Sequence, residues 1–110
     1  MDFPVSGKIN IVIFDNGRDD VFLIDMVKRL VAYEEKIIIW VIDGKEKKEY
    51  YKSVFFVNKS SCGDIKKIFN MKGDECLCRK IGIVMNGMIK YFNYGEDTDF
   101  IFAWVKERVK

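Results

Sequence analysis

Two cysteines separated by one residue, Cys76 and Cys78, are the residues best suited to chemistry in this sequence. In an extended segment, side chains two positions apart point to the same side, so the two sulfur atoms can approach each other. Arg79 and Lys80 follow directly, and neighbouring positive charge favours the thiolate form of a cysteine. A disulfide between the two would close a strained, easily reduced ring. The pair indicates a reversible thiol switch or a weak oxidoreductase centre, or else two small residues near the core.

The chain has three cysteines and no histidine. The absence of imidazole excludes Ser-His-Asp and Cys-His catalysis and any zinc or haem site that uses histidine. Three thiols do not complete the four ligands of a structural zinc site. The odd number also differs from the dense, even-numbered frameworks of small secreted domains. We therefore expect reduced thiols, no metal and no cofactor.

Acidic residues follow the first apolar segment of the chain, at Asp15, Asp19 and Asp20. A junction between strand and helix is a common ligand-binding place in α/β proteins, and carboxylates can hold Mg²⁺. The same residues also cap helices and complement the positive helix terminus. No glycine-rich phosphate loop accompanies them, so helix capping is the interpretation we favour.

The segment from residue 45 to residue 52 combines positive charge with two tyrosines. Its candidate nucleic-acid contacts are Lys45, Lys47, Lys48, Tyr50, Tyr51 and Lys52. Lysines can bind phosphates and tyrosines can stack on RNA bases. The whole chain, with 19 basic and 17 acidic residues, carries a net charge of only +2, and proteins that wrap nucleic acids usually have a larger positive excess. The segment is either a solvated connector or a contact of a factor docked on a ribonucleoprotein particle.

Apolar segments rich in β-branched residues predict strands at Ile9–Phe14, Ile37–Ile42 and Val54–Val57. Helical spacing of apolar residues predicts helices at about Asp19–Glu35 and Gly63–Asn70. The second strand has no polar alternation, which is typical of a central parallel strand buried on both faces. It is also far too short to cross a membrane.

The last third of the chain predicts a β-hairpin and a closing helix. Strands Ile81–Met85 and Met88–Phe92 flank Asn86-Gly87, two residues that tolerate the positive φ of a tight turn. A helix capped at Asp97 or Thr98 follows. The alternation of strands and helices over 110 residues predicts one α/β domain, residues 1–110, with a mixed sheet and helices on both faces.

This order of elements resembles the thioredoxin fold, in which a third parallel strand precedes a helix, a loop, a β-hairpin and a closing helix. The stretch Val54–Tyr91, VFFVNKSSCGDIKKIFNMKGDECLCRKIGIVMNGMIKY, is similar to the non-catalytic, substrate-binding domains of protein disulfide isomerases. It has their strand, their helix ending in Phe, their Glu-Cys pair and their hairpin. The resemblance implies a thioredoxin-like mixed sheet flanked by helices and ending in a hairpin and a C-terminal helix. The N-terminal half matches only in pattern.

The chain departs from thioredoxins at both parts of the redox site. The family has Cys-x-x-Cys where a helix follows its second strand, and the two candidate stretches, residues 16–19 and 44–47, contain no cysteine. The family also has a cis-proline before the fourth strand, near Leu77 here, whereas the only proline is Pro4. These departures imply a domain without dithiol chemistry.

In the resembled isomerase domains, peptides bind an apolar patch near the vacated active-site end. The resemblance implies that Met71, Leu77 and Cys76 border this patch. We expect partner-binding residues at Met71, Leu77 and Met88, and core filling is the alternative for them. Flexible methionines suit varied partners. The leading hypothesis is a redox-inactive protein-interaction module, a scaffold or chaperone-like subunit and not an enzyme. The alternatives are an accessory factor docked on a ribonucleoprotein particle such as the ribosome, and a thiol-disulfide oxidoreductase that uses Cys76 and Cys78.

The N-terminus lacks the basic start and apolar stretch of a signal peptide. If Met1 is the natural start, we expect a cytoplasmic or nuclear protein with no membrane attachment. If the chain is an excised domain of the disulfide isomerase type, we expect the endoplasmic reticulum.

Overall fold

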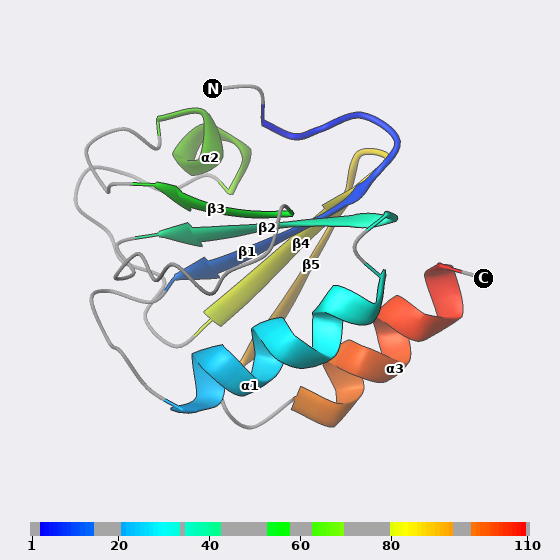
Figure 1. Ribbon diagram of the computed structural model, residues 1–110. Coiled ribbons are helices and arrows are strands. Elements are labelled where there is room, and N and C mark those ends of the chain that lie inside the picture. Colours follow the sequence, from blue (N-terminus) through cyan, green and yellow to red (C-terminus); the bar gives the residue numbers. More distant parts are fainter. Residues whose placement is uncertain are drawn as a thin grey trace.

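The computed structural model describes residues 3–14, 21–33, 35–42, 53–57, 63–69, 80–93 and 98–109 (Figure 1). Its elements in chain order are β1 (Ile9–Phe14), α1 (Val21–Leu30), the 3₁₀ turn η1 (Val31–Tyr33), β2 (Ile37–Ile42), β3 (Val54–Val57), α2 (Gly63–Ile68), β4 (Lys80–Met85), β5 (Met88–Asn93) and α3 (Thr98–Arg108). The predicted strands, hairpin and closing helix are confirmed.

The strands form one mixed sheet in the order β3-β2-β1-β4-β5. The first three strands are parallel, whereas β4 runs antiparallel to both β1 and β5. All residues of β1 and β2 are buried, because these strands lie inside the sheet and are covered on both faces. This confirms the interpretation of Ile37–Ile42 as a central parallel strand.

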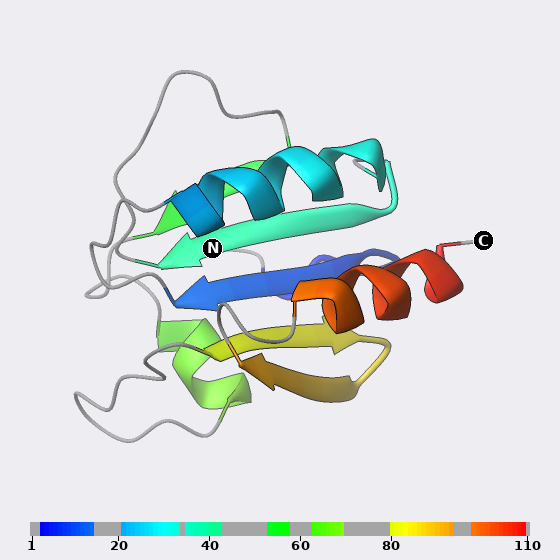
Figure 2. The ribbon, with the colours of Figure 1, turned by 90° about the horizontal axis from the view of Figure 1, so that it is seen from below.

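Helices α1 and α3 lie side by side over one face of the sheet, and α2 covers the other (Figures 1 and 2). The buried side chains between the sheet and helices α1 and α3 contain no aromatic ring, and we call this side the aliphatic face. They are Ile9, Ile11, Ile13, Met26, Val27, Leu30, Ile37, Ile39, Val41, Ile81, Ile83, Ile101 and Val105. Trp104 of α3 packs against this cluster. The position of α1 and α3 on one face and α2 on the other confirms the prediction of helices on both faces (Figures 1 and 2).

The opposite side, which we call the aromatic face, has a second cluster built around rings. Its buried members are Phe3, Val12, Phe14, Ile38, Trp40, Ile42, Ile65, Phe69 and Val84. The ring of Phe3 contacts Trp40 edge-on, with 5.5 Å between ring centroids, and the Phe69 ring lies 5.8 Å from Phe14 and 5.7 Å from Tyr91. The cover of this face comprises α2 and the N-terminal segment around Phe3.

One buried polar side chain, Asn10 on β1, holds that N-terminal segment in place. Its Oδ1 accepts hydrogen bonds from the backbone N–H of Val5 (2.9 Å) and from Nε1 of Trp40 (3.1 Å). Its Nδ2 donates to the carbonyl oxygens of Val5 (3.0 Å) and Lys8 (3.1 Å). Since the amide is fully bonded, its burial carries no unpaired polar group.

Two places in the hairpin need particular residues: the turn itself, and Gly82 within β4. Asn86 and Gly87 adopt φ values of 48° and 83°, as expected for the turn type that Asn-Gly favours. Gly82 on β4 faces Phe69 so closely that a Cβ atom at this position would overlap with the ring. Only glycine therefore lets α2 pack this near to the hairpin.

The first helix ends earlier than its apolar spacing predicts. The α-helical part stops at Leu30, and η1 carries the chain through Val31–Tyr33. The N–H of Lys36 then donates to the carbonyl of Tyr33 (2.8 Å), which turns the chain into β2. Tightening of the last turn to 3₁₀ geometry is a common way to satisfy the final carbonyls of a helix.

Candidate functional site

Of the predicted functional residues, only Met88 belongs to the part of the chain that the structure describes. It is the first residue of β5 and is 42% exposed. The other candidates lie outside the described residues: Met71, Leu77, Cys76, Cys78, Lys45, Lys47, Lys48, Tyr50, Tyr51, Lys52, Asp15, Asp19 and Asp20. Their predicted roles stay predictions.

Met88 opens a strand that lies at the edge of the sheet, with β4 on one side and no further described strand on the other. Met85 and Met88 pair directly across the two-residue turn, so they exchange the hydrogen bonds that close the hairpin. In an antiparallel pair the bonded and non-bonded positions alternate along the strand. The backbone N–H and C=O groups of Ile89, Tyr91 and Asn93 are therefore directed away from β4.

The side chains of β5 are unusually apolar for an exposed strand. Met88, Ile89 and Tyr91 are 42%, 40% and 43% exposed. Lys90 is also exposed and is the only charged residue between Met88 and Asn93. We call these four residues, Met88, Ile89, Lys90 and Tyr91, the β5 surface.

The two sides of the β5 surface differ in character. Tyr91 pairs with Gly82 and its ring lies 5.7 Å from that of Phe69, which puts Tyr91 on the aromatic face. Ile89, two residues earlier, shares that face because side chains alternate along a strand. Met88 and Lys90 project to the aliphatic face. The β5 surface thus has apolar side chains, Ile89 and Tyr91, on the aromatic face, and Met88 and Lys90 on the aliphatic face.

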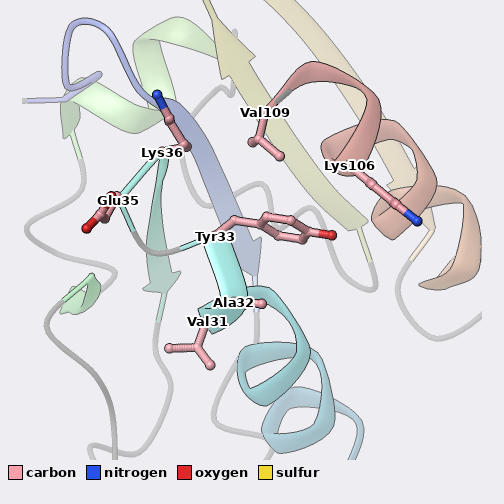
Figure 3. A pocket seen from close by; sticks show the side chains of 7 residues that line it. All are labelled: Val31, Ala32, Tyr33, Glu35, Lys36, Lys106 and Val109. Atoms are coloured by element: carbon pink, nitrogen blue, oxygen red, sulfur yellow. The ribbon is translucent and has the colours of Figure 1, made fainter.

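A groove of about 470 Å³ lies at the C-terminal end of α1, between η1 and the last turn of α3 (Figure 3). Val31, Ala32, Tyr33, Glu35, Lys36, Lys106 and Val109 line it. The Tyr33 ring points toward α3 and Lys106, whereas Lys36 and Glu35 point elsewhere (Figure 3). The groove lies where β1 and β2 begin, since Ile9 donates to the carbonyl of Lys36 (3.0 Å). The charged residues of its lining are Glu35, Lys36 and Lys106. They do not converge on one point, so the groove is not arranged as a polar binding site.

The sequence interpretation proposed Met88 as a partner contact, and that role stays a prediction; it did not foresee that Ile89 and Tyr91 are exposed beside Met88. Both were assigned to a strand, and their alternation with Lys90 was visible. Their exposure follows from the position of β5 at the edge and from the small size of α2, which are properties of long-range packing. Only the order of the strands distinguishes these side chains from core residues.

The described ranges contain no group of three His, Cys, Asp or Glu side chains that could hold a metal ion. Among the same residues, no helix combines the length and apolarity that crossing a membrane requires. Comparisons of the chain with protein-family models, with curated proteins and with solved structures found no match.

Proposed function

We propose that this protein is a redox-inactive, thioredoxin-like interaction module that binds a protein partner through the β5 surface. The observation that carries the proposal is the run of exposed large apolar side chains, Met88, Ile89 and Tyr91, on a strand at the sheet edge. Natural proteins usually protect such strands with charges, prolines or bulges. β5 has one such charge, Lys90, yet keeps three large exposed apolar side chains around it, and an exposed apolar group of this kind indicates a contact surface.

The thioredoxin-like part of the proposal is supported by the end of the fold. A parallel strand (β3), a helix (α2), a β-hairpin (β4 and β5) and a closing helix (α3) follow one another. That is the order on which the resemblance to disulfide isomerase domains rests. The absence of cysteine from residues 16–19 and 44–47 supports an inactive redox site.

The test is affinity purification of the tagged protein from its source, with and without RNase, followed by quantitative mass spectrometry. We expect a stoichiometric protein partner that survives RNase. The double variant Ile89→Thr/Tyr91→Thr should lose it at least tenfold, because threonine keeps the strand propensity and removes the apolar contact. Phe55→Thr on the other edge strand, where Phe55 is 44% exposed, is the matched control and should retain the partner.

Two results would contradict the proposal. If the partner set disappears after RNase, the ribonucleoprotein interpretation replaces it, and the lysines and tyrosines of residues 45–52 become the first targets. If the protein accelerates insulin reduction by dithiothreitol and Cys76→Ser abolishes the effect, the oxidoreductase interpretation replaces it.

A further inference from the structure

We propose that the aromatic face contains a peptide-binding site, which the chain's own segment Phe3–Lys8 occupies as an internal ligand. The segment crosses the same side of the sheet as α2 (Figure 1). The site takes an apolar peptide with an aromatic residue two positions before an aliphatic one, as Phe3 precedes Val5. It is separate from the β5 surface and does not rest on the proposed function.

The first feature of the site is a pocket for one aromatic ring. The Phe3 ring contacts Trp40 edge-on, with 5.5 Å between ring centroids and an interplanar angle of 88°, and its centroid lies 6.3 Å from that of Phe69. Phe3 is 9% exposed, whereas Pro4 and Ser6 are exposed. Edge-on contacts between rings are favourable beyond the area that they bury. The pocket therefore favours an aromatic residue.

The second feature is the side-chain amide of Asn10, which binds the backbone of the segment. Its Oδ1 accepts a hydrogen bond from the Val5 N–H (2.9 Å), and its Nδ2 donates to the Val5 carbonyl (3.0 Å). An amide bonded to both backbone groups of one residue recognises main chain whatever the side chain. The indole N–H of Trp40 donates to the same Oδ1 (3.1 Å), which holds the amide in this orientation after the segment has left.

The segment can leave without disrupting the sheet. Residues 3–8 belong to no strand or helix, so their departure breaks no hydrogen bond between strands. Parts of a protein with few buried contacts open at a lower free energy than the whole. Because the segment is tethered, it competes with a free peptide at an effective concentration on the order of millimolar. The unaltered chain therefore binds a free peptide more weakly than the empty site does.

A second copy of the chain is not the occupant that we expect. Exchange of the segment between two copies would re-form the contacts that each copy already makes alone. It would add the entropic cost of association and no new contact at this site. A peptide of another protein gains the site whenever its own contacts exceed those of Phe3 and Val5.

The experiment titrates the full chain with the acetylated and amidated peptide Phe-Pro-Val-Ser-Gly-Lys, the sequence of residues 3–8. The chain carries Trp104→Phe, so that the emission of Trp40 alone reports binding. Phe3→Ala in this background should tighten binding at least tenfold, because the pocket loses its own ring. A peptide with Ala in place of Phe should not bind. Phe100→Ala, at a ring of α3 that is 69% exposed, is the matched control and should leave the affinity unchanged.

A second variant loosens the segment and leaves every contact of the site in place. A Cβ atom at Gly7 would meet nothing within 4 Å, but the backbone there has a φ of 78°, which strains any residue with a side chain. Gly7→Ala should therefore tighten peptide binding about threefold to tenfold. Methylation of the Val nitrogen of the peptide removes the hydrogen bond to Asn10 and should weaken binding at least tenfold.

Hydrogen exchange of the unaltered chain tests the release directly. The Val5 amide should exchange at a rate that low urea concentrations do not change, whereas urea should accelerate exchange in β1 and β2, because local opening exposes little surface.

The proposal is overturned if the Val5 amide exchanges only through global unfolding, or if neither Phe3→Ala nor Gly7→Ala tightens peptide binding. It is also overturned if the methylated peptide binds as tightly as its parent. A dimer in sedimentation that Phe3→Ala makes monomeric would assign the site to segment exchange between copies and overturn it as well.

Discussion

The two faces of the sheet differ in the side chains that they bury and in the elements that cover them. The aliphatic face is covered by α1 and α3, of 10 and 11 residues, and its buried side chains are isoleucine, valine and leucine with one methionine. The aromatic face is covered by α2, of 6 residues, and by the segment around Phe3. Its rings contact one another from Phe55 at one edge, through Trp40, Phe3 and Phe69, to Tyr91 at the other.

The difference shows how a face covered by one short helix can still be filled, and which part of that face stays exposed. Aromatic side chains bury much area each, so a few of them fill a layer that one short helix cannot reach across. The N-terminal segment is held against this face by the Asn10 amide, which makes hydrogen bonds with Val5, Lys8 and Trp40. Because α2 is short, the ends of the aromatic row stay exposed at Phe55 and Tyr91. The proposed binding edge is the open end of this layer.

The largest effect is expected from Phe69→Ala, which removes the ring that contacts Phe3, Phe14 and Tyr91. The free energy of unfolding should fall by about 3–5 kcal/mol, measured by urea denaturation. Native-state hydrogen exchange should show amides of α2 and of Val5 opening at lower free energy than those of α1 and α3. Phe69→Leu is the milder control. If hydrogen exchange became faster by the same factor in α1, α2 and α3, the two faces would not differ in stability in the way described.

A smaller effect is expected from Asn10→Ala, because the change leaves the Trp40 indole N–H and the Val5 N–H and C=O without their shared partner. The free energy of unfolding should fall by about 1–3 kcal/mol. Trp40→Phe removes one donor of the same network, so the double variant Asn10→Ala/Trp40→Phe should destabilise less than the sum of the single variants. Strict additivity would show that Asn10 does not act on the aromatic face as a shared tether.

The smallest effect is expected at the surface of the aliphatic face, from Arg29→Ala. The guanidinium of Arg29 lies 3.6 Å from the centroid of the Phe102 ring and 3.7 Å from a carboxylate oxygen of Asp99, a side chain that is 95% exposed. Loss of the ring contact should cost about 0.5–1 kcal/mol. Asp99→Asn should cost less, because exposed ion pairs contribute little. A cost for Asp99→Asn equal to that for Arg29→Ala would assign the link between α1 and α3 to the ion pair.

Local signals account for most of the fold that could be predicted. Asn86-Gly87 specified the hairpin because turn chemistry acts within four residues, and the unbroken run Ile37–Ile42 revealed its burial on both faces. The end of α1 was missed by several residues, because apolar spacing continues where the backbone tightens into η1. Nothing local marks Asn10 as a tether, since its partners are fixed by how the segment before β1 folds over the sheet.

The candidate site was less accessible to sequence reasoning than the fold. The position of β5 at the edge depends on the pairing of β1 with β4, which joins residues about 70 positions apart along the chain. The sequence alone could mark Met88 as suited to a partner, but not that Ile89 and Tyr91 lie beside it in the open. The roles of Met71, Leu77, Cys76 and Cys78 stay predictions.

The two tryptophans of the chain are divided between the two faces. Trp40 is buried among the rings of the aromatic face, and Trp104 packs on the aliphatic cluster with the Arg108 guanidinium 3.8 Å from its ring centroid. Indole emission shifts with the polarity around the ring, so Trp40→Phe and Trp104→Phe each leave a single fluorophore that reports one layer. The protein thus contains one natural fluorescent probe on each face. Tryptophan fluorescence of the two variants can therefore distinguish local opening of one face from global unfolding.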